Sequence, residues 1–98
     1  MTPRLLLQEA AKDDSREAFA WDEARSTGLG FEFLRALRVE LAAAERNPTQ
    51  FPLVLDDIRR VRLGRFPYSA FYVTMGEVTR VLAVMHDRRD PKRWQSRR

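Results

Sequence analysis

The stretch from Ile58 to His86 constrains the fold more than any other part of the chain. It contains two runs rich in β-branched and aromatic residues, Tyr68 to Thr74 and Val78 to Met85, joined at Met75-Gly76-Glu77. Glycine in so short a connection supplies the positive φ that a tight hairpin needs. The preceding Arg60-Val61-Arg62-Leu63 alternates basic and apolar residues, as a half-exposed strand does. These patterns predict a three-stranded antiparallel meander in the C-terminal half.

Both faces of the two longer strands carry apolar side chains. Phe71 and Val73 point to one face, together with Leu82 or Val84, and the other face holds Tyr68, Tyr72 and Val81. A strand that is apolar on both faces is normally covered on both. A chain of 98 residues covers one face well and the other only partly. We therefore expect an incompletely covered apolar surface beside a cluster of arginines.

The residues before this stretch predict one strand and two helices. Three leucines bounded by Pro3 and polar residues favour a short strand over Arg4 to Gln8. A first helix is expected from Glu9 to about Arg25, with Ala11, Ser15, Ala18 and Trp21 (or Asp22) at helical spacing and Trp21 as its anchor. A second is expected from about Phe31 to Arg46, ended by Asn47-Pro48. The predicted order is β-α-α-β-β-β, an α+β domain with a helical hairpin packed on an antiparallel sheet.

Length and composition predict one domain over residues 1–98, with a basic tail from about residue 87 to the end. The chain has no cysteine and one histidine, so we expect neither a disulfide nor a transition-metal site, and no cofactor. Leu5-Leu6-Leu7 is too short an apolar run for a signal peptide or a membrane span. A cytoplasmic protein is therefore expected.

The net charge of +4 conceals an asymmetry between the two halves. Residues 1–57 contain 7 basic and 11 acidic side chains, whereas residues 58–98 contain 11 basic and 3 acidic ones. Such an imbalance indicates either a polyanionic target or acidic partner, or two halves that neutralise each other within one molecule. The tail combines arginines with Trp94, which suits phosphate contact and stacking, or equally an ordinary solvated end with one docked aromatic.

Catalysis has few candidate residues. Imidazole titrates near neutral pH, which makes His86 the one candidate for acid–base chemistry. Arg60, Arg62 and Arg65 could surround a phosphorane, and Tyr68 or Tyr72 could orient a 2′-hydroxyl. Arginine is always protonated and cannot act as a general base. Because no second acid–base group accompanies His86, we favour a binding or structural role for it over catalysis.

Several fragments in fixed order resemble one family, the ParE branch of the ParE/RelE toxins, which are toxin halves of bacterial type II toxin–antitoxin pairs. The fragments are Ala11-x-x-Asp14, Glu17-Ala18-x-x-Trp21, Gly28-Leu29-Gly30-x-x-Phe33-Leu34, Asn47-Pro48-x-x-Phe51-Pro52, Arg59-Arg60, Arg65-Phe66-Pro67-Tyr68-x-x-Phe71-Tyr72 and His86-x-x-Arg89-Asp90-Pro91-x-x-Trp94-x-x-Arg97. Ser15 and Asp22 depart from the pattern, because family members often carry an apolar and an aromatic residue there.

The resemblance implies a small toxin neutralised by direct binding of a ParD-like antitoxin, in a hetero-oligomeric complex. ParE-type relatives poison DNA gyrase, whereas RelE-type relatives cleave mRNA on the ribosome. The chain lacks the clustered lysines and the C-terminal tyrosine associated with the RelE reaction, so the gyrase-directed, non-catalytic reading is favoured. The alternatives are a RelE-type endonuclease using His86, Arg62, Arg65 and Tyr68, or a degenerate toxin that only binds its antitoxin.

Two surfaces are expected from these considerations. The surface facing the target is predicted to contain the arginines of the sheet, the histidine and the tail, namely Arg60, Arg62, Arg65, His86, Arg88, Arg89, Trp94 and Arg97. The surface completed by the antitoxin is predicted to contain the apolar residues Tyr68, Tyr72, Val81 and Met85.

Overall fold

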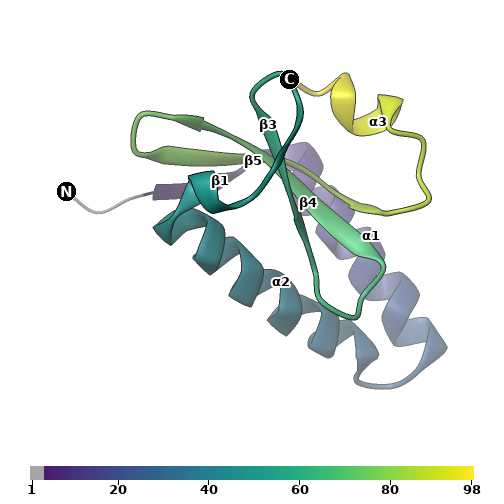
Figure 1. Cartoon of the computed structure of the whole chain (residues 1–98). Coiled ribbons are helices and arrows are strands. Elements are labelled where there is room, and N and C mark those ends of the chain that lie inside the picture. The colour runs from purple at the N-terminus through teal and green to yellow at the C-terminus, as the bar shows by residue number, and fades with distance from the viewer. Residues whose placement is uncertain (1–3) are drawn as a thin grey trace.

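The computed structural model describes residues 4–98, in which a mixed sheet carries two long helices on one face and a short helix on the other (Figure 1). The elements are β1 (Arg4–Leu7), α1 (Glu9–Arg25), α2 (Leu29–Arg46), the 3₁₀ turn η1 (Pro48–Gln50), β2 (Leu53–Leu55), β3 (Ile58–Arg62), β4 (Tyr68–Met75), β5 (Val78–His86) and α3 (Lys92–Gln95). The predicted α+β class and the order of its main elements are confirmed.

The sheet has five strands in the order β1-β5-β4-β3-β2, not three. The predicted meander of β3, β4 and β5 is present, and β1 pairs with β5 in parallel while β2 pairs with β3 antiparallel. The prediction fell short for a physical reason. The strand β2 has only three residues, all exposed, so it shows no alternation of buried and exposed side chains.

The two helices form a hairpin whose turn depends on glycine and on one carboxylate. Gly28 adopts a φ of 90°, a left-handed conformation that favours glycine. The Glu23 carboxylate accepts hydrogen bonds from the backbone N–H groups of Gly28 (2.9 Å) and Gly30 (3.0 Å), which are free at a helix start. A Cβ on Gly30 would lie 2.8 Å from the Phe19 ring, so the helices cross closely there.

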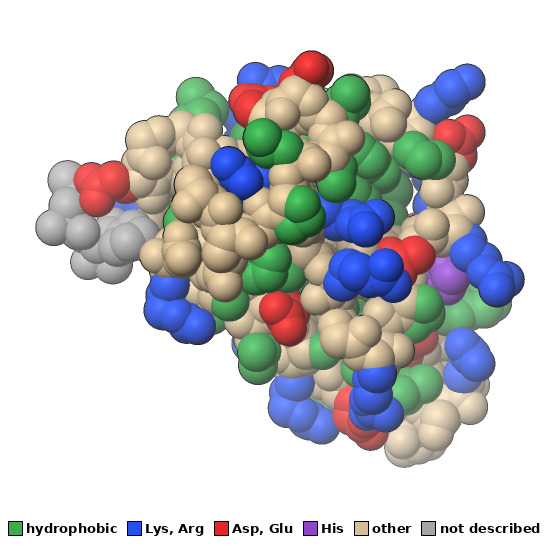
Figure 2. Space-filling view, in the orientation of Figure 1, with side chains coloured by type: hydrophobic (Ala, Val, Ile, Leu, Met, Phe, Trp, Pro, Cys, Tyr) green, Lys and Arg blue, Asp and Glu red, His purple; other side chains and the backbone are tan. Residues whose placement is uncertain are grey.

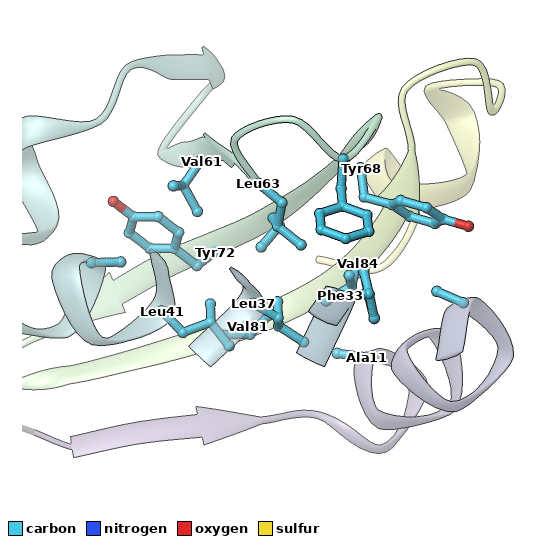
Figure 3. Close-up of a cluster of buried hydrophobic side chains, with 14 residues drawn as sticks. Ala11, Phe33, Leu37, Leu41, Val61, Leu63, Tyr68, Tyr72, Val81 and Val84 are labelled. Carbon is cyan, nitrogen blue, oxygen red and sulfur yellow. The ribbon is translucent and has the colours of Figure 1, made fainter. Parts of the chain in front are cut away.

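The main core lies between this hairpin and the sheet (Figure 3). Phe33, Leu37 and Leu41 of α2 recur at helical spacing and are buried against the sheet. From β4 the same core receives Tyr68 and Tyr72, and the Tyr68 ring lies 5.1 Å from that of Phe33. The helical hairpin therefore covers most of this face of the sheet.

A second, smaller core lies on the opposite face. Its members are Ile58, Phe71, Val73, Leu82, Ala83, Met85 and Trp94. The indole of Trp94 in α3 stacks on the ring of Phe71, with centroids 4.2 Å apart and an angle of 12° between the planes. The C-terminal helix thus covers this second face of the sheet.

A β-bulge in β5 decides which residues reach which core. Phe71 pairs with Ala83 but Tyr72 pairs with Val81, so Leu82 is an extra residue on β5. Leu82 and Ala83 consequently both join the second core, whereas Val84 joins the main core. Of the two partners predicted for Phe71 and Val73, the structure selects Leu82 and not Val84.

Candidate functional site

The most prominent hollow of the described chain lies between α1 and the C-terminal end of β5. It has a volume of about 690 Å³, with Ala18, Trp21 and Arg25 on the helix side and Val84 to His86 on the strand side. A second hollow of about 390 Å³ shares Trp21, Arg25, Tyr68 and His86 with the first and extends to Asp22 and Arg65. Figure 2 shows the histidine at the surface with Lys and Arg side chains around it. We call the two hollows together the α1–β5 cavity.

His86 lies where β5 ends and meets Tyr68 of β4, its partner across the strands. The two rings are 5.2 Å apart and nearly perpendicular. The backbone N–H of Arg88 donates a hydrogen bond to Nδ1 of His86 at 3.0 Å, so in the neutral ring the proton sits on Nε2. Neither nitrogen of the neutral ring then has a free lone pair for proton abstraction. Burial raises the pKa of the Tyr68 phenol, which keeps that hydroxyl protonated.

Asp22 is the unusual residue of this cavity. The sequence left Trp21 and Asp22 as alternatives for the buried position and made Trp21 the anchor, but the structure buries Asp22 (4% exposed) and exposes Trp21 (62%). Within residues 4–98, the Oδ2 atom of Asp22 is buried and has no hydrogen-bond donor. Burial raises the pKa of its carboxyl, against the smaller opposing attractions of Arg25 and His86.

The predicted catalytic alternative is only partly assembled. His86, Tyr68 and Arg65 border the same hollow. Arg62 does not, because its neighbour Val61 faces the main core and successive side chains of a strand point to opposite faces. Arg62 instead pairs with Asp87 at 3.3 Å. The structure therefore separates Arg62 from the other three residues.

The predicted target-facing arginines do not form one surface. Arg60 and Arg62 lie on the α3 side of the sheet by the same alternation, whereas Arg65 and His86 open towards α1. Several arginines of residues 58–98 pair with acids of residues 1–57, namely Arg65 with Glu32, Arg89 with Glu17 at 3.0 Å and Arg98 with Asp57 at 2.6 Å. Mutual neutralisation of the halves, one of the two alternatives read from the sequence, is thus present in part.

The tail is docked by two residues that were predicted to contact the target. Trp94 is buried on Phe71, so its ring is not free for stacking with a ligand. The guanidinium of Arg97 pairs with the carboxylate of Asp14 (Nη2 to Oδ1, 3.1 Å) and donates to the carbonyl of Leu82 at 3.2 Å. Asp14 in turn accepts from the N–H of Val84 at 3.0 Å. These two side chains occupy edge groups of β5 beyond the end of β1, which is a structural role.

The four residues expected to meet the antitoxin are buried in the described chain. Tyr72 and Val81 are 0% exposed, and Tyr68 and Met85 are also buried. The expectation was wrong in its premise, because the hairpin covers the first three and Trp94 lies in the cluster that covers Met85. The free chain does not present Tyr72 and Val81 to a partner, whereas Tyr68 and Met85 border the α1–β5 cavity.

Other apolar side chains are exposed instead, and the sequence reasoning missed them. They lie at the sheet edges, on the outer faces of the helices and in the hairpin turn, namely Leu6, Trp21, Phe31, Val39, Leu53, Val54, Leu55 and Met75. Val39 could have been found from helix phase, because it falls outside the stripe of Phe33, Leu37 and Leu41. The exposure of β2 had no comparable signal.

Among residues 4–98, no three acidic or histidine side chains gather as a metal site would require. No helix in that part of the chain is long and apolar enough to cross a membrane.

Comparison with known proteins decides the family. The family model described as the ParE toxin of the type II toxin–antitoxin system parDE matches residues 5–91. The chain belongs to the ParE toxin family. A search of curated protein sequences finds no match.

Solved structures share the fold of this ParE-type chain at low sequence identity. The chromosomal ParDE toxin–antitoxin system from P. aeruginosa matches with a TM-score of 0.73 and 16% identity, over 87% of this chain and 96% of that one. A double arginine-to-alanine mutant of the E. coli toxin RelE in the free state matches with 0.67 and 16%, over 99% and 94%. The isolated E. coli RelE toxin gives 0.63 and 17%, over 97% and 95%.

Proposed function

We propose that this ParE-type chain inhibits DNA gyrase or a related type II topoisomerase in the cytoplasm, and that a ParD-like antitoxin neutralises it by direct binding. Membership of the ParE family and the likeness to a ParDE complex support the toxin and its antitoxin. The observation that carries the mode of action is the state of His86. The neutral ring offers no free lone pair, because Arg88 donates to Nδ1 and the proton sits on Nε2. The hydrogen bond therefore argues against proton abstraction by the neutral ring, which supports a binding role for this site.

Expression of the chain without an antitoxin tests the target. We expect growth arrest, induction of the DNA-damage response and accumulation of topoisomerase–DNA cleavage complexes. The His86→Ala variant should still trap these complexes. Growth arrest with intact DNA and no cleavage complexes would contradict the gyrase assignment.

The second candidate is ribosome-dependent mRNA cleavage. It is favoured by the likeness to RelE over nearly the whole chain and by the cavity that His86, Tyr68 and Arg65 share. Under this hypothesis His86→Ala abolishes mRNA cleavage while the protein stays folded. Wild-type mRNA cleavage by His86→Ala would exclude this histidine from the reaction.

The antitoxin surface is proposed for the exposed apolar residues and not for the buried tyrosines. Leu53, Val54 and Leu55 on the edge strand β2 present both apolar side chains and a strand edge, which favours addition of a partner segment. Loss of antitoxin binding in Val54→Lys, with unchanged thermal stability, supports this placement. If tight antitoxin binding is found without any toxicity, the chain is a degenerate toxin.

A further inference from the structure

Asp22 poses an energetic problem that the ParE assignment does not resolve. A carboxylate taken out of water is costly unless donors replace its solvent. The Oδ2 atom of Asp22 is buried and receives no hydrogen bond from any residue between 4 and 98. The residue nevertheless lines the smaller hollow of the α1–β5 cavity. A ligand bound in this hollow can donate the missing hydrogen bond to the Asp22 carboxylate.

The surroundings of Asp22 restrict the charge of that occupant. Arg25, Arg65 and His86 line the same hollow. The adjoining hollow adds Arg89 and Arg93 together with Asp14 and Glu17, and Arg89 pairs with Glu17. Because Arg65 pairs with Glu32 and Arg89 with Glu17, the cations that a partner's lysine or arginine would meet are chiefly Arg25 and Arg93. A matching ligand has neutral N–H donors that face the Asp22 carboxylate. It also has an anionic group that reaches the arginines.

Trp21 supplies a third feature. It precedes Asp22 on α1, is 62% exposed and lines both hollows. Arg25 lies one helical turn beyond Trp21 and also lines both. An exposed indole beside arginines is the combination on which nucleobases stack while their phosphates are held. An ordinary apolar peptide would use neither the arginines nor the carboxylate.

We propose that the α1–β5 cavity binds a guanine nucleotide, with the base edge donating to Asp22, the base stacked on Trp21 and the phosphate held by Arg25 and Arg93. Guanine presents two adjacent donors, N1–H and the N2 amino group, which match the two oxygens of a carboxylate. Adenine places a ring acceptor beside its amino group, and this acceptor would face one carboxylate oxygen unpaired. The cavity therefore selects guanine over adenine. Binding includes a local movement that uncovers this oxygen, because it is buried in the free chain.

The size of the cavity is consistent with such a ligand. The hollow at Asp22 measures about 390 Å³ and continues into one of about 690 Å³. Small-molecule sites span roughly 300–1,000 Å³. The guanine could belong to a free nucleotide or to a base in a single strand, since both present the same edge. The inference is independent of the gyrase proposal, and its failure would leave the cleavage-complex test unaffected.

The test titrates the full chain with GMP, AMP and inorganic phosphate in separate experiments, followed by ¹H–¹⁵N NMR. The chain has two tryptophans, and the Trp21 indole resonance is the one missing in Trp21→Phe. We expect GMP to shift this resonance, AMP to bind about tenfold more weakly or worse, and phosphate alone to leave it in place. A guanine-containing trinucleotide that binds more tightly than GMP identifies a strand as the source, and equal affinity identifies the free nucleotide.

Variants of two carboxylates on the same helix provide the control. Asp22→Asn should weaken GMP binding at least tenfold and abolish the preference over AMP, without lowering the thermal midpoint, because it removes a buried unpaired charge. Asp13→Asn is the matched control, since Asp13 is exposed and pairs with Arg16 outside the cavity. Equal binding of GMP and AMP, or GMP binding that survives Asp22→Asn, overturns the proposal. The proposal is also overturned if GMP does not bind and Asp22 is instead required for antitoxin binding.

Discussion

The two faces of the sheet are closed in very different ways. On one face α1 and α2 cover Tyr68, Tyr72, Val81 and Val84 with two long helices. On the other face the four-residue helix α3 places a single large side chain, Trp94, on Phe71. The Asp14–Arg97 pair then fastens the tail to α1. The comparison teaches that the face without long helices is closed by a small C-terminal segment that depends on a few contacts.

The largest expected effect comes from emptying the main core. Phe33 is fully buried among the rings of Phe66 and Tyr68, so Phe33→Ala should lower the free energy of unfolding by about 4 kcal/mol. Trp94→Ala on the other face should cost about 3 kcal/mol, because its cluster is smaller and its own ring is at the boundary with solvent. Chemical denaturation measures both. A cost below about 1 kcal/mol for Trp94→Ala would show that α3 does not close that face.

Loss of the Asp14–Arg97 pair, which holds the tail on α1, should have the next largest effect on stability. Arg97 is mostly buried in its pair with Asp14, so Arg97→Gln should cost about 2 kcal/mol by leaving a carboxylate and a strand carbonyl without their donor. Arg88→Gln is the matched control, since Arg88 is exposed, and it should change stability by about 0.5 kcal/mol or less. Thermal denaturation compares them.

The same pair of variants sharpens the functional comparison. Arg88→Gln should weaken target inhibition while antitoxin binding is retained. If Arg97→Gln weakens inhibition without loss of stability, the tail contacts the target through Arg97, and the structural role assigned to that residue is wrong.

Alkaline pH should act on the helix-covered face more than on the α3 face. Burial raises the pKa of the Tyr72 phenol above its ordinary value of 10.0, and its hydroxyl donates to the carbonyl of Pro48. The folded state therefore keeps a proton that the unfolded chain loses, so stability falls as pH rises from about 10 upward. Tyr72→Phe should be less stable by about 1 kcal/mol at neutral pH and show a smaller alkaline loss. Equal alkaline losses would contradict this.

The smallest effect concerns Asp22. Because burial raises the pKa of its carboxyl above 3.8, the folded state binds this proton more tightly than the unfolded chain does. The charge therefore destabilises the protein at neutral pH, and this penalty disappears as pH falls through the folded pKa towards the unfolded one. Asp22→Asn should exceed wild type in stability at neutral pH, with the difference shrinking in acid. A difference that grows in acid would contradict the sign of the shift.

Most of the fold could be predicted from the sequence because each helix and strand depends on residues that are close together in the chain. The first helix begins at Glu9 and ends at Arg25 as predicted, and Gly76 has the positive φ expected at the turn of the long hairpin. The helical periodicity also predicts which residue is buried near the end of α1. The spacing of Ala11, Ser15 and Ala18 continues to Asp22, and Trp21 was preferred only for its apolar character.

The site could be predicted less well because it depends on contacts between residues that are far apart in the sequence. The pairing of Arg97 with Asp14 joins the tail to the first helix across 83 residues, and sequence offers no signal for such a pair. The bulge at Leu82, which turns Val84 to the other face, is equally silent in the sequence. The expectation of an uncovered apolar surface failed because the helical hairpin covers Tyr72 and Val81, and because Trp94, assigned to the target-facing surface, docks on Phe71 instead.

The central claim is that the chain acts on its target by binding and not by moving a proton. The most direct measurement incubates purified wild type and His86→Ala with DNA gyrase and supercoiled plasmid, and quantifies DNA linearised on protein denaturation. The account predicts gyrase-dependent cleavage complexes in both, at similar toxin concentrations. Absence of cleavage complexes with wild type, together with ribosome-dependent mRNA cleavage that His86→Ala abolishes, would contradict it.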